Sequence, residues 1–230
     1  MTYQPKSQNL LDHGTTVGPQ IYRILRARII SNEMEPGIRI SESEIASEYD
    51  VSRQPVREAF IKLAEEGLLE VRPQRGTFVR KITVSAVMDA RFVREAIEAD
   101  IARYLAANAS DATISKLRSQ ISEQRAALDN PQRFMELDDI FHATLAEAAG
   151  KARVWRIVEG LKSQMDRVRH LSMLRFPAPK LVSQHAAIVE AIANHDTESA
   201  VDAMRGHLQE ILNDLPEIAK GRPEFFEERP

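Results

Sequence analysis

Residues 52–79, with the sequence SRQPVREAFIKLAEEGLLEVRPQRGTFV, constrain the fold more than any other segment of this chain. Ser52 is a favourable helix N-cap, and Pro55 is tolerated in the first turn of a helix. Gly67 is typical of a helix end. Apolar residues recur between these signals at the spacing of one helix face, namely Val56, Phe60, Leu63 and Ala64.

A β-hairpin is expected directly after this helix, with strands at 68–71 and 77–79 joined by a turn with a basic tip. Upstream, residues 41–44 have the Ser-x-x-Glu form of a capping box, so a short helix begins there. Residues 19–31 have the apolar spacing of a further helix. Short helices followed by a basic hairpin are the outline of a winged helix-turn-helix.

In such a fold the second helix of the pair enters the major groove, and the wing lies along the backbone or minor groove. Arg53 and Arg57 are four residues apart and share a helix face, and arginine is the residue that most often reads guanine. An ion pair between Arg57 and an acid of the same domain is the alternative. The predicted DNA-contacting residues are Arg53, Arg57, Ser52, Gln54, Arg75, Gly76 and Thr77.

Charge is distributed unevenly along the chain. The formal net charge is −3, whereas residues 51–81 carry seven basic and four acidic side chains. A local basic patch on an acidic molecule can still bind phosphates.

From about Val84 onward every segment has helical periodicity, and no segment has the alternation of a strand. Breaks at Asp111, Pro131, Gly150, Pro177 and Asn194 delimit the helices. The expected helices are 84–108, 111–129, 132–149, 151–175, 179–194 and 196–215.

The predicted fold class is mostly α: an N-terminal winged helix-turn-helix followed by an all-helical bundle. The expected domains are a disordered arm (1–16), the DNA-binding head (17–82), a bundle that binds metal and ligand (83–215) and a loose C-terminal tail (216–230).

Composition excludes several classes of protein. The chain has no cysteine, which excludes disulfides and Cys-ligated zinc or iron–sulfur sites. No apolar run approaches the ~20 residues that cross a bilayer, and the N-terminus lacks the apolar core of a signal peptide. We therefore expect a cytoplasmic protein that is not in the membrane.

A carboxylate and three imidazoles are expected to face the core of the bundle. Asp138 and His142 are four residues apart within an apolar helix stripe, and His185 and His207 lie on the apolar stripes of two later helices. Burial of these groups is costly unless something satisfies them, and a divalent metal does so. Zn is the first choice, with Ni, Mn or Fe as alternatives. Hydrogen-bonded core residues are the alternative to a metal site.

Arg94 also lies on an inward stripe, in the first helix of the bundle, and needs an anionic partner. Glu98, one turn further on, is one candidate partner. The other is the carboxylate of a small ligand, which a guanidinium can grip with two hydrogen bonds. Arg169 is a second candidate for effector binding, with a solvated helix face as its alternative.

Residues 52–79 resemble the winged-helix signature of GntR-family transcription regulators. The segments LDDIFHATLAEAAG, QHAAIVEAI and MRGHLQEI resemble the FCD domain, the ligand-binding bundle of that family's FadR branch. The matching segments lie within residues 19–212 and cover most of the chain.

The resemblance implies a homodimer that binds a palindromic operator in double-stranded DNA, with Arg53 and Arg57 reading bases. It implies a metal held by Asp138, His142, His185 and His207, and a small carboxylate effector, such as a sugar acid, held by Arg94. Many relatives have an arginine where this chain has Ser43. The contact made by that arginine is therefore not expected here.

The sequence thus favours a ligand-responsive transcription regulator, a repressor and not an enzyme. A metal sensor, in which the ion itself is the signal, is the first alternative. A metalloenzyme with an appended DNA-binding head is the second, although no catalytic motif such as HExxH accompanies the candidate ligands.

Overall fold

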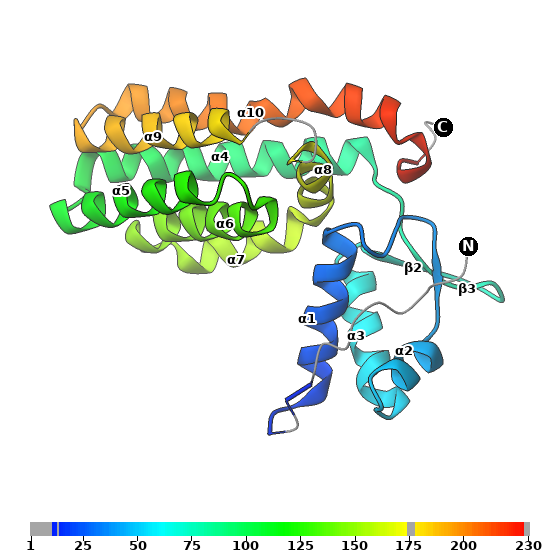
Figure 1. Ribbon diagram of the computed structural model, residues 1–230. Coiled ribbons are helices and arrows are strands. Elements are labelled where there is room, and N and C mark those ends of the chain that lie inside the picture. Colours follow the sequence, from blue (N-terminus) through cyan, green and yellow to red (C-terminus); the bar gives the residue numbers. More distant parts are fainter. Residues whose placement is uncertain (1–10, 13, 174–177, 228–230) are drawn as a thin grey trace. The chain divides into compact units, whose positions relative to one another are not determined.

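The computed structural model describes residues 11–12, 14–173 and 178–227 (Figure 1). They form two compact units. One unit combines the chain up to Ala86 with residues from Ala219 onward, and the other comprises Val87–Ile218.

The first unit packs three helices around a small antiparallel sheet with strand order β1-β3-β2. Arg39 of β1 lies opposite Phe78 of β3, and Leu69 of β2 lies opposite Val79. Helix α3 contacts both α1 and α2. In chain order the elements are α1 (Val17–Ile30), β1 (Arg39–Ile40), α2 (Glu42–Glu48), α3 (Arg53–Glu65), β2 (Leu69–Arg72) and β3 (Gly76–Val79).

Local sequence signals explain where these helices begin. The Ser41 hydroxyl accepts a hydrogen bond from the backbone N–H of Glu44, and the Glu44 carboxylate accepts one from the backbone N–H of Ser41, which completes the predicted capping box. Ser52 is the N-cap of α3, as predicted, but its side chain makes no capping hydrogen bond. Strand β1 was not predicted, because two residues are too few to display an alternating pattern.

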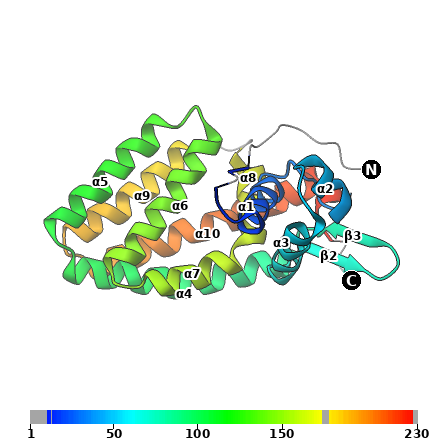
Figure 2. The ribbon, with the colours of Figure 1, turned by 90° about the horizontal axis from the view of Figure 1, so that it is seen from below.

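The second unit is all-helical, which confirms the predicted fold class. Figure 2 shows its long helices running alongside one another. Helix α5 packs against α6 and α9, and α6 packs against α7. The helices are α4 (Val84–Asn108), α5 (Asp111–Ala126), α6 (Pro131–Ala148), α7 (Ala152–Leu161), α8 (Ser163–Met173), α9 (Pro179–Ala193) and α10 (Thr197–Gly221).

The single helix predicted over 151–175 is wrong. Lys162 separates α7 from α8, and Gly160, in the last turn of α7, precedes this break by two residues. The ammonium group of Lys162 lies 2.7 Å from a carboxylate oxygen of Asp166 and 2.9 Å from one of Asp139. These contacts join the residue between the two helices to α6 and to α8. Residues 174–177, which include the break predicted at Pro177, lie outside the described residues.

The loose tail predicted over 216–230 is also incorrect for the described residues. Pro216 lies inside α10, and the helix continues beyond it to Gly221 because Leu215 and Ile218 on its inner face are buried. A short 3₁₀ turn (Pro223–Phe225) follows, and Phe225 and Phe226 are buried. The backbone N–H of Ile82 donates to the carbonyl of Phe225 at 2.8 Å, so this segment is part of the first unit.

The disordered arm predicted over 1–16 lies largely outside the described residues. Of the part that is described, Asp12 and Thr15 contact the start of α1. The side-chain amide of Gln20 donates to the Asp12 carbonyl at 2.8 Å and to the Thr15 hydroxyl at 2.9 Å.

Candidate metal centre and nucleic-acid interface

The first turns of α3 present a polar, solvent-exposed face. Arg53, Gln54 and Arg57 are all exposed. A nitrogen of the Arg53 guanidinium lies 3.2 Å from a carboxylate oxygen of Glu42, but the arginine side chain is 70% exposed. Such a surface pair is weak and leaves the guanidinium able to turn to another partner. Arg57 forms no ion pair within the described part of the chain, so the alternative of an internal ion pair does not hold there.

The β2–β3 hairpin places Arg75 at an exposed tip, followed by Gly76 at the start of β3. Gly76 has φ of +109°, and a Cβ there would lie 2.8 Å from Nε of Arg39. Both the backbone conformation and the close approach of Arg39 favour glycine at this position. Thr77 is half-buried on β3. The wing therefore has the shape and the basic tip that the sequence predicted, while the DNA contacts of its residues stay a prediction.

Three helices of the second unit bring the four predicted metal ligands together. Asp138 and His142 lie one turn apart on α6, His185 lies on α9 and His207 lies on α10. One ligand atom from each residue falls within 4.8 Å of all the others. The four side chains are nearly inaccessible to solvent, with His207 the most exposed at 7%.

The Nε2 atoms of the three imidazoles face one another. Nε2 of His207 lies 3.2 Å from Nε2 of His142 and 3.2 Å from Nε2 of His185. An oxygen of Asp138 lies 3.5 Å from Nε2 of His185 and completes the group. Oδ1 of Asp138 has no hydrogen-bond partner among the described residues.

Each histidine uses its other nitrogen, Nδ1, to contact an oxygen of a neighbouring side chain. For His142 this is Glu98 at 2.5 Å, and for His185 it is Gln124 at 2.8 Å. For His207 it is Gln184 at 3.3 Å. Because these oxygens only accept hydrogen bonds, each Nδ1 carries the proton, and each neutral ring keeps a bare lone pair on Nε2.

A third group fixes each of these acceptors. The Glu98 carboxylate accepts hydrogen bonds from the guanidinium of Arg94. The amide of Gln124 donates to the backbone carbonyl of Leu137 at 3.3 Å, and the amide of Gln184 donates to Glu210 at 2.9 Å. The amide oxygens must therefore point toward the histidines. Outer contacts of this kind hold metal-binding imidazoles in one tautomer and orientation.

This arrangement fits a divalent metal ion. Three bare Nε2 lone pairs cannot hydrogen-bond to one another, and the nearby Asp138 is a further acceptor. A cation at the centre satisfies all four groups, which are otherwise buried at high cost. Three imidazoles and one carboxylate suit Zn²⁺ and, with additional positions, other divalent ions of the first transition row.

The protonation states agree with such a site. Burial lowers the pKa of His185 to about 3, and burial with the neighbouring imidazoles holds the pKa of His207 well below its usual value. Burial by itself would raise the pKa of Asp138, but the Arg169 guanidinium and the imidazoles hold it well below the usual range. At neutral pH the rings of His185 and His207 are neutral and the Asp138 carboxylate is ionised, as metal ligands must be.

The two candidate effector-binding arginines border this site. Arg94 is buried and pairs with Glu98, as one of the two interpretations of the sequence required. Arg169 forms an ion pair with Asp138, and its side chain is 12% exposed. The solvated helix face considered for Arg169 is therefore wrong.

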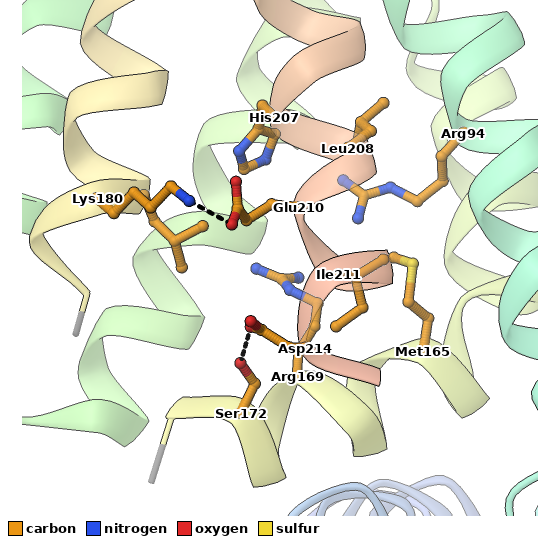
Figure 3. Close-up of a pocket in the computed structure, with 11 residues that line it drawn as sticks. Arg94, Met165, Arg169, Ser172, Lys180, His207, Leu208, Glu210, Ile211 and Asp214 are labelled. Atoms are coloured by element: carbon orange, nitrogen blue, oxygen red, sulfur yellow. Dashed lines mark hydrogen bonds and ion pairs between the residues drawn. The ribbon is translucent and has the colours of Figure 1, made fainter. Parts of the chain in front are cut away.

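Arg94, Arg169 and His207 also line a cavity of about 150 Å³ (Figure 3). Figure 3 shows both guanidinium groups and the imidazole pointing toward the same space. The cavity thus adjoins the metal ligands. Its remaining lining residues are Met165, Ser172, Lys180, Leu181, Leu208, Glu210, Ile211 and Asp214.

Sequence reasoning missed Gln124 and Gln184 and gave Glu98 no role at the histidines. A signal existed for Gln124, which is fully buried at helical spacing from Leu117 and Ile121 on the inner face of α5. A glutamine on such a face needs a partner. Gln184 directly precedes His185, and nothing in its local pattern indicates its role.

Among the helices that the structure describes, none has the length and apolar character needed to cross a membrane. Residues 18–79 match the family described as bacterial regulatory proteins, gntR family, and residues 89–210 match the FCD domain.

Relatives agree with these matches over nearly the whole chain. The HTH-type transcriptional repressor RspR of Escherichia coli (strain K12) is 41% identical over 215 residues, which are 92% of this chain and 94% of that protein. An HTH-type transcriptional regulator of Streptomyces ambofaciens is 36% identical and covers 93% of this chain and 91% of its own. These relatives are transcription regulators and not enzymes.

Solved structures share the architecture. A putative GntR transcriptional regulator from Rhodococcus sp. RHA1 matches with a TM-score of 0.72 and 27% identity, over 86% of this chain and 99% of its own. McbR/YncC of E. coli has the same fold, with a TM-score of 0.75 at 15% identity, over 88% of this chain and 98% of its own. The chain is therefore a DNA-binding transcription regulator of the GntR family that carries an FCD domain.

Proposed function

We propose that this regulator is a repressor that responds to a small carboxylate through a metal-dependent site in its helical domain. The metal is held by Asp138, His142, His185 and His207, with Zn²⁺ as the first choice and Ni, Mn or Fe as alternatives. The protein acts in the cytoplasm as a homodimer on a palindromic operator.

The observation that carries this proposal is the convergence of three Nε2 atoms, each on a ring whose Nδ1 is already engaged. Hydrogen-bonded core histidines would place a donor against each acceptor, and this cluster does not. When bound, the ion supplies positive charge and open coordination positions that a carboxylate oxygen can take.

The cavity next to the cluster supports an organic effector. Arg94 and Arg169 border the cavity and the metal ligands at once. Guanidinium groups bind carboxylates with paired hydrogen bonds, so these two arginines hold the effector beside the metal. A sugar acid is one candidate.

In this proposal, exposed polar residues of the first unit contact the DNA. Arg53, Arg57 and Gln54 of α3 meet base edges in the major groove, while Ser52, Arg75, Gly76 and Thr77 contact the sugar-phosphate backbone or the minor groove. An effector that favours the arrangement with lower operator affinity shifts the population off the DNA.

A metal sensor is the second candidate, and one observation favours it. Four protein ligands are enough to close a tetrahedral site, and the group is buried. Closed tetrahedral sites are typical of structural zinc, which needs no further ligand.

One experiment separates the two candidates. The protein first selects its preferred DNA from random duplexes. The affinity of this DNA for metal-loaded and for metal-stripped protein is then measured, with and without each member of a panel of small carboxylates. The effector proposal predicts that one carboxylate lowers DNA affinity of the metal-loaded form only. A DNA affinity that tracks buffered free metal, and responds to no carboxylate, supports the metal sensor and contradicts the effector proposal.

A further inference from the structure

The segment that follows α10, residues 222–227, is packed into the first unit. Phe225 and Phe226 are 2% and 5% exposed. The backbone N–H of Ile82 donates to the carbonyl of Phe225 at 2.8 Å, and the N–H of Glu227 donates to the carbonyl of Ile82 at 3.0 Å. The segment thus forms a short parallel bridge with the chain that leaves the wing.

Ion pairs accompany this packing. Nε of Arg80, the residue directly after β3, lies 3.3 Å from a carboxylate oxygen of Glu227. A guanidinium nitrogen of Arg222 lies 3.9 Å from a carboxylate oxygen of Glu35, which precedes β1. These pairs are exposed and contribute little. The two buried phenylalanines and the backbone hydrogen bonds therefore provide most of the attachment.

The attachment lies at the base of the wing. Strand β3 ends three residues before Ile82, and the backbone N–H of Arg80 still donates to the carbonyl of Leu68 at 2.9 Å. A short hairpin is marginally stable alone, so its orientation depends on the contacts at its base. Residues 222–227 supply such contacts on the β3 side.

The same segment is the continuation of a helix that carries a metal ligand. His207 lies on α10, which ends at Gly221, one residue before the segment begins. The chain passes between the two units twice, after Ala86 in α4 and after Ile218 in α10. Of these two helices, only α10 carries one of the four ligands.

Helix α10 is a stiff connection between His207 and the segment. The 14 residues from His207 to Gly221 rise by about 21 Å along the helix axis. Pro216 removes one hydrogen bond from this stretch. Leu215 and Ile218, on either side of the proline, are buried and keep the helix continuous. A restraint on His207 therefore reaches the end of α10.

We propose that residues 222–227 form a strap that couples the metal site to the wing. A bound ion holds Nε2 of His207 close to Nε2 of His142 and His185, where bare lone pairs otherwise repel one another. The ion thus restrains α10, and the strap passes this restraint to Ile82. This inference rests on the metal site of the proposed function and adds to it the route by which that site reaches the DNA-binding unit.

Amide hydrogen exchange, followed by NMR with Zn²⁺ as the probe, tests the coupling. The N–H groups of Val79 and Arg80 report on the base of the wing. They donate to Ile38 and Leu68 inside the sheet, so they stay protected even where the strap is detached. At a free Zn²⁺ concentration about 100 times its dissociation constant, exchange slows by up to about a hundredfold where opening releases the ion. We expect this slowing in α10, and slowing of about threefold or more at both reporters.

An insertion of Gly-Ser-Gly between Gly221 and Arg222 tests the route. It keeps every residue of the strap and all four ligands, but a flexible linker transmits no restraint. The variant should bind Zn²⁺ as tightly as the wild type in competition with a chelator, and Zn²⁺ should still protect α10. The effect of Zn²⁺ on Val79 and Arg80 should be lost. The matched control carries the same three residues after Pro230 and should behave as the wild type.

The outcomes separate this inference from the proposed function. If Zn²⁺ protects α10 of the wild type but neither reporter, the metal site stands and the coupling is wrong. If the insertion variant shows the same protection of the reporters as the wild type, the strap is not the route. If Zn²⁺ does not bind, the metal site of the proposed function fails and this inference fails with it.

Discussion

Oε2 of Glu98 lies 2.5 Å from Nδ1 of His142, on the opposite side of the ring from the Nε2 that faces the other histidines. Arg94 pairs with the same carboxylate. Burial by itself would raise the pKa of Glu98, but Arg94 and His142 lower it to about 2. An ionised Glu98 thus fixes the tautomer of His142 and makes the ring a more basic ligand.

The Glu98→Gln variant should therefore bind metal about tenfold to a hundredfold more weakly than the wild type. Glutamine keeps an oxygen acceptor but loses the charge. Competition with a chelator of known affinity measures the difference. Glu95→Gln, on the same helix and outside the ligand cluster, is the control. Equal metal affinity in Glu98→Gln and the wild type would contradict the role of Glu98.

The His185→Ala variant should lose most of the bound metal and all response to effector, because it removes one of the four ligands. Metal content is measured by mass spectrometry after dialysis. His195→Ala is the control, since His195 lies outside the cluster and contacts the backbone carbonyl of Ala106. DNA binding by the metal-free wild type and by His185→Ala should be alike. Full metal content in His185→Ala would show that the site is misassigned.

The Arg53→Ala variant should weaken specific DNA binding by about 1–3 kcal/mol and relax the preference at one base pair. The reason is that the exposed guanidinium on the first turn of α3 is free to reach a base edge. Selection from random duplexes before and after the change gives the preference at each position. Arg118→Ala, at an exposed ion pair on α5, controls for the lost charge. An unchanged sequence preference would refute the assignment of α3 as the reading helix.

The phenol of Tyr22 should lose its proton at a higher pH than an ordinary tyrosine. Burial, followed by its hydrogen bond to Glu66, raises the pKa of the phenol to about 12. The folded state then binds this proton more tightly than the unfolded chain, where the pKa is about 10. The resulting stabilisation is complete below about pH 10 and is lost as the pH rises toward 12.

Absorbance near 295 nm follows this ionisation, and Tyr22→Phe should lose one step near pH 12. Tyr104→Phe, at an exposed position on α4, controls for removal of one tyrosine elsewhere. If the late step persists in Tyr22→Phe, another group is responsible.

The Phe225→Ala variant should destabilise the first unit, because Phe225 is 2% exposed and its carbonyl accepts from Ile82. Truncation of a buried phenylalanine costs about 3–5 kcal/mol, and the lower end applies here because the terminal segment can detach. Chemical denaturation measures the change. Phe92→Ala is the control, since Phe92 is 68% exposed. If Phe225→Ala were as stable as Phe92→Ala, the C-terminal segment would not stabilise the first unit, and the prediction of a loose tail would stand.

Much of the local structure could be predicted from the sequence. The capping box at Ser41 and Glu44 and the helix α4 over 84–108 agree with the structure because they depend on residues within one or two turns. The continuation of α10 through Pro216 could not be predicted in this way. It depends on packing of the inner face of the helix, which outweighs the local signal of the proline.

By itself the sequence determined that Asp138 and His142 share the inner face of one helix, because helical spacing relates residues four apart. It also placed His185 and His207 on inward stripes. Only the tertiary structure decided that all four meet, that Glu98, Gln124 and Gln184 take up the Nδ1 atoms, and that Asp214 lines the adjoining cavity. The physical reason is range: periodicity sets the face on which a side chain lies, whereas packing between helices sets which faces meet.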